Sequence, residues 1–185
     1  MRTLALVSLA LATALVAPGC STAIKEGAGL ALGAKGTYLS TRPLAAAQES
    51  RPLGAYRRFE LGTITDDIGG KAPAALLGHL PEAFAEQIRS KKLPNDPTGK
   101  TLVLRGRIIH YESSDMLGIA TGPLEEVIVR AEMVDKETGA VLAEANCICR
   151  TTARVNVGVK SKAQGLAKAI VGWIDNRYPK DQRVD

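Results

Sequence analysis

Three stretches of the chain alternate apolar and polar residues with a period of two, and they restrict its fold more than any other feature. They cover residues 101–112, 125–135 and 141–155. Successive side chains of a strand point to opposite faces of a sheet, so each stretch predicts a strand with one face more apolar than the other. The loop at 136–140 contains Gly139, which can adopt the positive φ of a bulged hairpin turn. We therefore expect the last two strands to form an antiparallel hairpin.

The same alternation assigns side chains to the two faces of the predicted sheet. In the first strand, one face should carry Leu102, Leu104, Gly106, Ile108 and His110, and the other Val103, Arg105, Arg107, Ile109 and Tyr111. In the third strand, Cys147 and Cys149 should lie on the apolar face. The more polar face should contain five arginines: Arg105, Arg107, Arg130, Arg150 and Arg154. Ile109, Ile128 and Ile148 should lie on the same face.

Two helices and one further strand are predicted around these three strands. Residues 56–65 are a strand candidate, and apolar residues at spacings of three and four predict helices over 73–93 and 161–178. Pro81 should either kink the first helix or start a second segment, and Pro179 should end the other helix. This order predicts an α+β fold, with two helices on one face of a mainly antiparallel sheet of about four strands.

The amino terminus has the order of a secretory signal. Arg2 is followed by an apolar stretch at 4–17, which is shorter than the roughly 20 residues that a membrane-spanning helix needs. The segment at 17–20, Ala-Pro-Gly-Cys, resembles the lipobox of bacterial lipoproteins, in which the cysteine is lipidated and becomes the first residue. This resemblance implies a diacylglycerol thioether and an acyl chain on Cys20. Ser21, which is not Asp, implies sorting to the outer membrane.

This assignment divides the chain into four parts. Residues 1–19 are the expected signal peptide, 20–55 a lipidated cysteine with a flexible Gly-, Ala- and Pro-rich tether, 56–178 a single α+β domain, and 179–185 a polar tail. We expect an anchored protein facing the periplasm. A secreted, soluble periplasmic protein whose Cys20 is incidental is the alternative.

Charge and cysteine content exclude few functions. The net charge of +5 comes from 24 basic and 19 acidic residues, a surplus too small to require a nucleic acid as partner. Cys147 and Cys149 should point to the same face of a strand, where a disulfide between them is geometrically unfavourable. We interpret them as small buried side chains, with a metal pair completed by His79 or His110 as the alternative. No cofactor is expected.

A longer pattern carries a family resemblance. The segment VDKETGAVL at 134–142, preceded by LVLRGRI and followed by GLAKAIVGWID, resembles a family of uncharacterised bacterial lipoproteins. Those proteins look like the amino-terminal domain of TolB and the periplasmic domain of the curli secretion lipoprotein. The resemblance covers about residues 56–178 and implies an α+β envelope domain without a catalytic site.

Two functional hypotheses follow. The first is a non-catalytic outer-membrane lipoprotein that binds an envelope protein or an anionic envelope glycolipid through the arginine-bearing face. A solvated face with cross-strand charge pairs explains the same arginines. The second is a periplasmic small-ligand binder or hydrolase that uses loops near Asp66, His110 and Asp115. Nothing in the sequence sets the oligomeric state.

Overall fold

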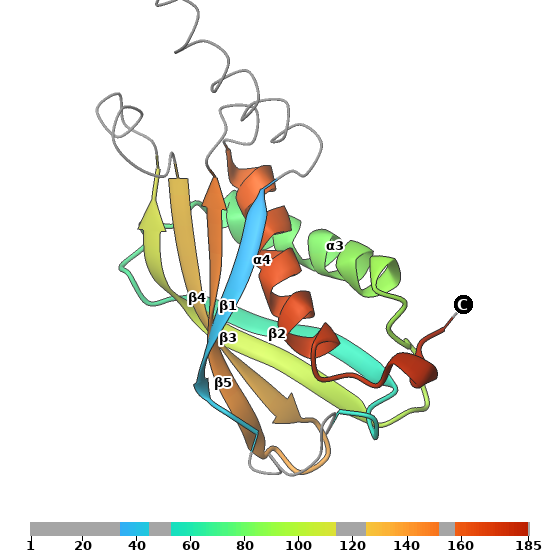
Figure 1. Cartoon of the computed structure of the whole chain (residues 1–185). Helices are drawn as coiled ribbons and strands as arrows, with labels where there is room; N and C mark the ends of the chain where they lie inside the picture. Colours follow the sequence, from blue (N-terminus) through green and yellow to red (C-terminus); the bar gives the residue numbers. More distant parts are fainter. Residues whose placement is uncertain (1–33, 45–52, 114–124, 152–157, 185) are drawn as a thin grey trace, which may run out of the picture.

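Five strands form one sheet in the computed structural model, which describes residues 34–44, 53–113, 125–151 and 158–184. The strands are β1 (Lys35–Arg42), β2 (Arg58–Asp66), β3 (Thr101–Glu112), β4 (Glu125–Asp135) and β5 (Val141–Thr151). Their order across the sheet is β1-β5-β4-β3-β2 (Figure 1). β2 runs parallel to β3, and the other neighbours are antiparallel.

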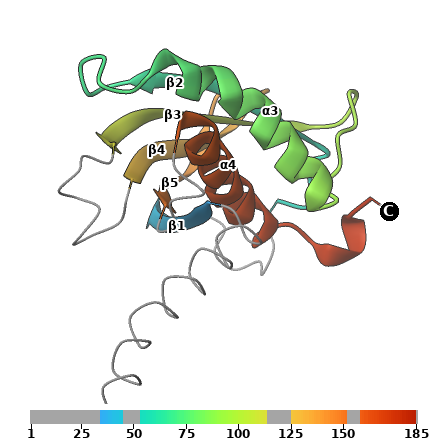
Figure 2. The same ribbon diagram turned by 90° about the horizontal axis from the view of Figure 1, so that it is seen from above.

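Two helices cover one face of this sheet. They are α3 (Ala74–Ser90) and α4 (Val159–Asp175), which lie side by side in Figure 2. Their apolar faces and the inward side chains of the strands form one core, in which Leu104, Val129 and Trp173 are fully buried. The expected α+β fold is confirmed, with one strand more than expected.

The additional strand lies inside the predicted tether. We expected a flexible segment over 20–55, and this was wrong for Lys35–Arg42, which forms the edge strand β1. Gly36 allows the close approach of β1 to α4, since a Cβ atom there would lie 2.6 Å from the backbone nitrogen of Ala169. The inner side of β1 carries Gly36, Tyr38 and Ser40, so it shows no apolar alternation that the sequence analysis could detect.

A bulge in β3 corrects the predicted faces of two residues. The register with β4 shifts between Ile108 and His110. His110 therefore lies opposite Ile128 on the exposed side, and Tyr111 turns toward the core, where its hydroxyl accepts a hydrogen bond from Lys162. One extra residue in a strand exchanges the faces of all residues beyond it.

The other predicted elements agree with the structure within a few residues at most boundaries. α3 continues through the exposed Pro81 as one helix. The hairpin between β4 and β5 is confirmed, with Gly139 at a φ of +71°. The tail at 179–184 packs on the domain, where the Val184 amide donates to the Lys92 carbonyl at 3.0 Å. No helix in the described part of the chain is both long enough and apolar enough to cross a membrane.

Candidate functional site

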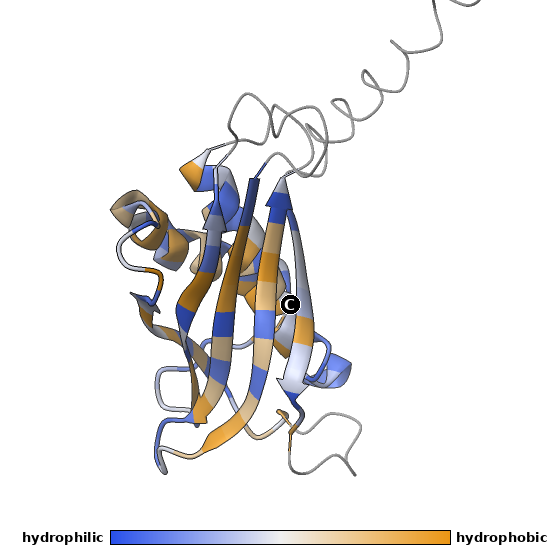
Figure 3. Ribbon diagram, turned by 90° about the vertical axis from the view of Figure 1, so that its left-hand side faces the viewer, coloured by the Kyte–Doolittle hydropathy of each residue, from blue (hydrophilic) through white to orange (hydrophobic). Residues whose placement is uncertain are grey.

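The broadest functional surface is the side of the sheet that no described helix covers, which we call the open face (Figure 3). Hydrophilic and hydrophobic residues alternate along its strands. Strand register places Leu39, Asn146, Arg130, Arg107 and Thr65 in one row across all five strands, the arginine row. The neighbouring isoleucine row contains Thr37, Ile148, Ile128 and His110.

The arginines of the open face that lie outside the arginine row form ion pairs. Arg105 Nε lies 2.8 Å from Glu132 Oε2, and Arg150 Nε pairs closely with Glu126 Oε2. These side chains are about half exposed on the arginine side, so each pair contributes at most about 1 kcal/mol to the free energy of unfolding. This part of the open face matches the solvated, charge-paired surface that the sequence also allowed.

The two arginines inside the arginine row are less well neutralised. Arg107 and Arg130 lie directly opposite each other on β3 and β4. Arg107 Nε is 3.6 Å from Asp67 Oδ2, and Arg130 Nε donates to the amide oxygen of Asn146 at 3.4 Å. Arg154, the fifth arginine of the predicted surface, lies outside the described residues, as does Cys20.

Apolar side chains lie next to the arginine row. Ile128 and Ile148 face each other on β4 and β5 and are partly exposed. Leu39, at the edge-strand end of the arginine row, is 63% exposed. The open face therefore combines cationic and aliphatic side chains within a few residues.

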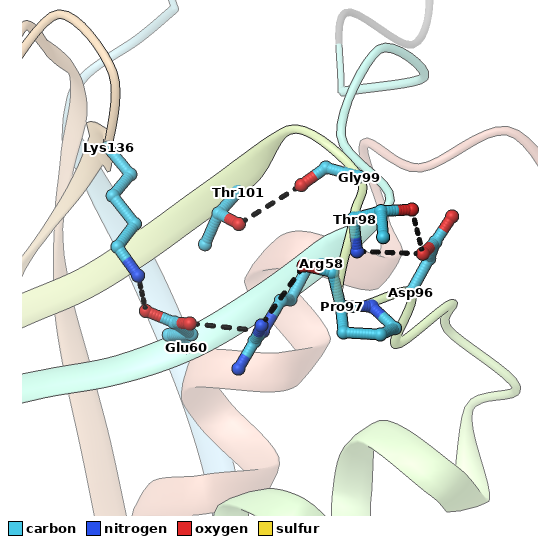
Figure 4. Close-up of polar contacts among 8 residues, drawn as sticks. All are labelled: Arg58, Glu60, Asp96, Pro97, Thr98, Gly99, Thr101 and Lys136. Carbon is cyan, nitrogen blue, oxygen red and sulfur yellow. Dashed lines mark hydrogen bonds and ion pairs between the residues drawn. The ribbon is translucent and has the colours of Figure 1, made fainter.

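A second basic surface is the groove of about 600 Å³ between β2 and α3. Its floor contains Phe59, Phe84 and Ile88, and its rim contains Arg58 and Arg89. Arg58 pairs with Glu60 at 3.0 Å, and Glu60 also pairs with Lys136 at 2.8 Å (Figure 4). Arg89 is in the last turn of α3, where a cation offsets the helix dipole. These cations thus have structural explanations.

A buried charge cluster lies at the end of the sheet where β4 begins. Lys162 of α4 is 1% exposed, and its Nζ is 3.2 Å from Glu125 Oε1 and 2.8 Å from the Tyr111 hydroxyl. The other oxygen of Glu125 accepts the Gly158 amide at 2.7 Å. Every member of this cluster has a partner, which is what stabilises charges away from water.

The opposite end of β4 is held by Asp135. Its carboxylate accepts hydrogen bonds from Tyr56 and Lys100, each at 2.8 Å, and from the amides of Glu137 and Thr138 in the hairpin. Two hydrogen bonds hold the pKa of Asp135 well below its usual range. The bond from Lys100 has the larger effect and the bond from Tyr56 the next largest. The pKa of Tyr56 is raised, mainly because the hydroxyl is buried and to a smaller extent because it is hydrogen-bonded to Asp135. This arrangement fixes the hairpin, so the Asp-x-x-x-Gly segment at 135–139 has a structural role.

The two cysteines lie on the core face, as expected. Both are buried with unbonded sulfur atoms, and burial raises the pKa of each thiol to about 12. Such thiols remain protonated and are weak nucleophiles and metal ligands at neutral pH. Within the described ranges, no group of three or more His, Cys, Asp or Glu side chains is arranged to hold a metal ion.

The structure does not bring Asp66 and His110, two residues of the alternative hydrolase hypothesis, together in one site. The Asp66 carboxylate accepts the amides of Ile68 and Ala72, at 2.8 and 3.1 Å, and so closes its own turn. His110 lies on the open face, 3.8 Å from Glu112 and 4.0 Å from Glu126. Asp115 falls outside the described residues.

Sequence comparison finds no matching protein family and no matching curated protein. Among solved structures, the fold is similar to that of PelC dodecamers from Paraburkholderia phytofirmans in two crystal forms, one of them a point variant. The TM-score is 0.51 for both, and the identity is 19% and 18%. In each case the match covers 78% of this chain and 99% of the PelC chain. At this identity the comparison establishes that the two proteins share a fold.

Proposed function

We propose that the protein is a non-catalytic lipoprotein of the bacterial envelope, held to the outer membrane through Cys20 and acting by binding through its open face. The single observation that carries the binding role is the open face itself, where arginine and aliphatic side chains share one uncovered surface. Arginine is enriched at protein interfaces, whose buried centre is more apolar than the rest of the surface. The apolar segment before Cys20 and the lipobox-like sequence support the anchor.

Self-association is part of the proposal. The PelC structures with the same fold are dodecamers. Both edges of the sheet here, β1 and β2, have backbone groups without a neighbouring strand among the described residues, and such edges can pair with another copy. We expect the detergent-extracted protein to sediment as an oligomer. Sedimentation as a monomer at micromolar concentration would contradict self-association without affecting the anchor.

The anchoring claim can be tested by metabolic palmitate labelling in a Gram-negative host. The wild type should incorporate label and travel with the outer membrane on a density gradient. Cys20→Ala should lose both properties, because it removes the sulfur that would carry the lipid. Cys147→Ala is the matched control and should keep the label, since its thiol is buried in the core. An unlabelled wild type in the soluble periplasmic fraction would contradict the proposal.

A further inference from the structure

The open face contains one arrangement that its own charges leave unbalanced. Arg107 and Arg130 occupy directly opposed positions on adjacent antiparallel strands. At such positions the Cβ atoms are about 4.5–5.5 Å apart, and like charges destabilise the sheet. The arginine row contains no carboxylate, because its other members are Leu39, Asn146 and Thr65.

The ion pairs within the described residues set these two arginines apart. Arg105 and Arg150 each have a carboxylate in direct contact. Arg130 has no carboxylate within 4.0 Å in the described part of the chain, where it donates a hydrogen bond to the neutral amide of Asn146. Among the described residues, the carboxylate contact of Arg107 is the 3.6 Å contact with Asp67, which also accepts a hydrogen bond from Thr65. Asp67 therefore offsets one of the two positive charges and leaves the other.

Arg107 and Arg130 lie in a depression of the open face and provide hydrogen-bond donors there. A shallow depression of about 350 Å³ is lined by three arginines, Arg105, Arg107 and Arg130, by two carboxylates, Asp67 and Glu132, and by Thr63, Thr65 and Gly106. Arg105 and Glu132 neutralise each other across 2.8 Å, so the charge left over in the depression comes from Arg107 and Arg130. Each guanidinium is a planar group with several N–H donors, which match the oxygens of phosphate and carboxylate groups. A phosphate monoester has three terminal oxygens and close to two negative charges. It can therefore bridge both arginines, whereas one carboxylate has only two oxygens and one charge.

The surroundings favour a phosphate that is attached to an apolar group. Ile128 is two residues before Arg130 on β4, and side chains two apart in a strand lie on the same face. Ile148 faces Ile128 on β5, and Leu39 ends the arginine row. A phosphate between the arginines would place the rest of an amphiphilic molecule over this aliphatic strip, where a free phosphate would make no contact.

We infer that Arg107 and Arg130 form a binding site for the terminal phosphate monoester of an anionic lipid, whose apolar part lies along Ile128 and Ile148. The choice of a lipid rests on the proposed membrane-associated function, which places the domain beside lipid headgroups. The phosphate chemistry rests on the arginine geometry alone. This site refines the open face from a general binding surface to one with a defined ligand class.

The inference also predicts an unusual effect on stability. If the two arginines had a structural role, removing their charge would lower the urea midpoint of unfolding. Because they repel each other in the unliganded protein, Arg130→Gln should instead leave that midpoint unchanged or raise it. Arg105→Gln breaks the 2.8 Å pair with Glu132 and should not raise it.

The test uses the full chain, purified from membranes in a neutral detergent and labelled with ¹⁵N-arginine. The Nε–Hε signals of the arginines are followed while dihexanoyl phosphatidic acid, inorganic phosphate or dihexanoyl phosphatidylcholine is added. Arg58, in the groove between β2 and α3, is the internal reference. The double variant R107Q/R130Q is compared with R42Q/R150Q, which removes the same charge from two arginines that pair with Glu144 and Glu126 and do not line the depression.

Phosphatidic acid should shift the Arg107 and Arg130 signals saturably and leave Arg58 unaffected. R107Q/R130Q should weaken binding about tenfold to a hundredfold, and R42Q/R150Q much less, because Arg42 and Arg150 already have carboxylate partners outside the depression. Inorganic phosphate should bind at least about tenfold more weakly than phosphatidic acid, and phosphatidylcholine should not saturate.

Three results would overturn the inference. The first is the absence of a saturable shift at Arg107 and Arg130. The second is equal weakening by both double variants, which would indicate general electrostatic attraction to the face. The third is equal affinity for inorganic phosphate and phosphatidic acid, which would remove the lipid from the assignment. None of these results depends on Cys20, so failure here is distinct from failure of the palmitate experiment.

Discussion

Replacing Lys162 with methionine would show how strongly the buried charge cluster stabilises the domain. Lys162 is 1% exposed and pairs with Glu125, which is 6% exposed. Methionine fills a similar volume without the charge, so the main effect is to leave the Glu125 carboxylate buried without its cation. The Gly158 amide still donates to that carboxylate and offsets part of the loss.

The magnitude follows from the cost of breaking one side of a buried ion pair. Such changes lower the free energy of unfolding by about 3–5 kcal/mol. Because Glu125 keeps the Gly158 hydrogen bond, we expect the lower end, about 3 kcal/mol. With a urea dependence of about 2 kcal/mol per molar, the midpoint should fall by about 1.5 M. The double variant Lys162→Met/Glu125→Gln should recover much of this, because the amide oxygen can still accept from Gly158.

Trp173 provides the assay. It is the single tryptophan of the chain and is fully buried, so its fluorescence reports loss of the core during urea unfolding. Lys136→Met is the matched control, because its 2.8 Å pair with Glu60 involves a lysine side chain that is 54% exposed. That variant should lose no more than about 1 kcal/mol. If Lys162→Met cost no more than Lys136→Met, the reasoning about the buried pair would be refuted.

Three further predictions concern Asp135, Gly165 and the cysteines. Since the pKa of Asp135 is lowered in the folded protein, its contribution is complete above the unfolded value of about 3.9 and is lost as the pH falls through the folded value. Asp135→Asn should therefore flatten the decline in urea midpoint below about pH 4, and an unchanged slope would count against this role. Gly165→Ala would force a Cβ against the Cys149 sulfur and should cost about 1–3 kcal/mol in urea unfolding, whereas a neutral effect would show that α4 can move away. Cys147 and Cys149 should react with Ellman's reagent only after unfolding, because their thiol pKa is raised to about 12, and rapid reaction of the native protein would contradict their burial.

The strands and helices that face the core were predictable from the sequence because their patterns are regular. Val129, Ala131 and Met133 alternate with Arg130 and Glu132, and Leu80, Phe84 and Ile88 recur at helical spacing. Both patterns follow from burying one face of an element. The placement of Cys147 and Cys149 in the core followed from the same argument.

The errors arose where that regularity is interrupted or absent. β1 is an edge strand whose inner residues include Gly36 and Ser40, so its contribution depends on contact with α4, which lies far along the chain. The bulge near Ile109 moved His110 and Tyr111 to the opposite faces. Neither feature has a local sequence signal of the kind that predicts strands and helices.

The candidate site was only partly predictable. The sequence placed Arg105, Arg107, Arg130 and Arg150 on one face, and the structure agrees. It did not show which arginines have carboxylate partners, because that depends on the register between strands. The opposition of Arg107 and Arg130, which distinguishes them from the other two, required the pairing of β3 with β4.

Intact-mass spectrometry of the protein isolated from membranes tests the proposed anchor most directly. The proposal predicts a mature chain that begins at Cys20 and carries the added mass of a diacylglycerol group and an amino-terminal acyl chain. Cys20→Ala should lack that added mass. An unmodified wild-type chain, or one beginning at another residue, would contradict the proposal that this protein is a lipid-anchored component of the envelope.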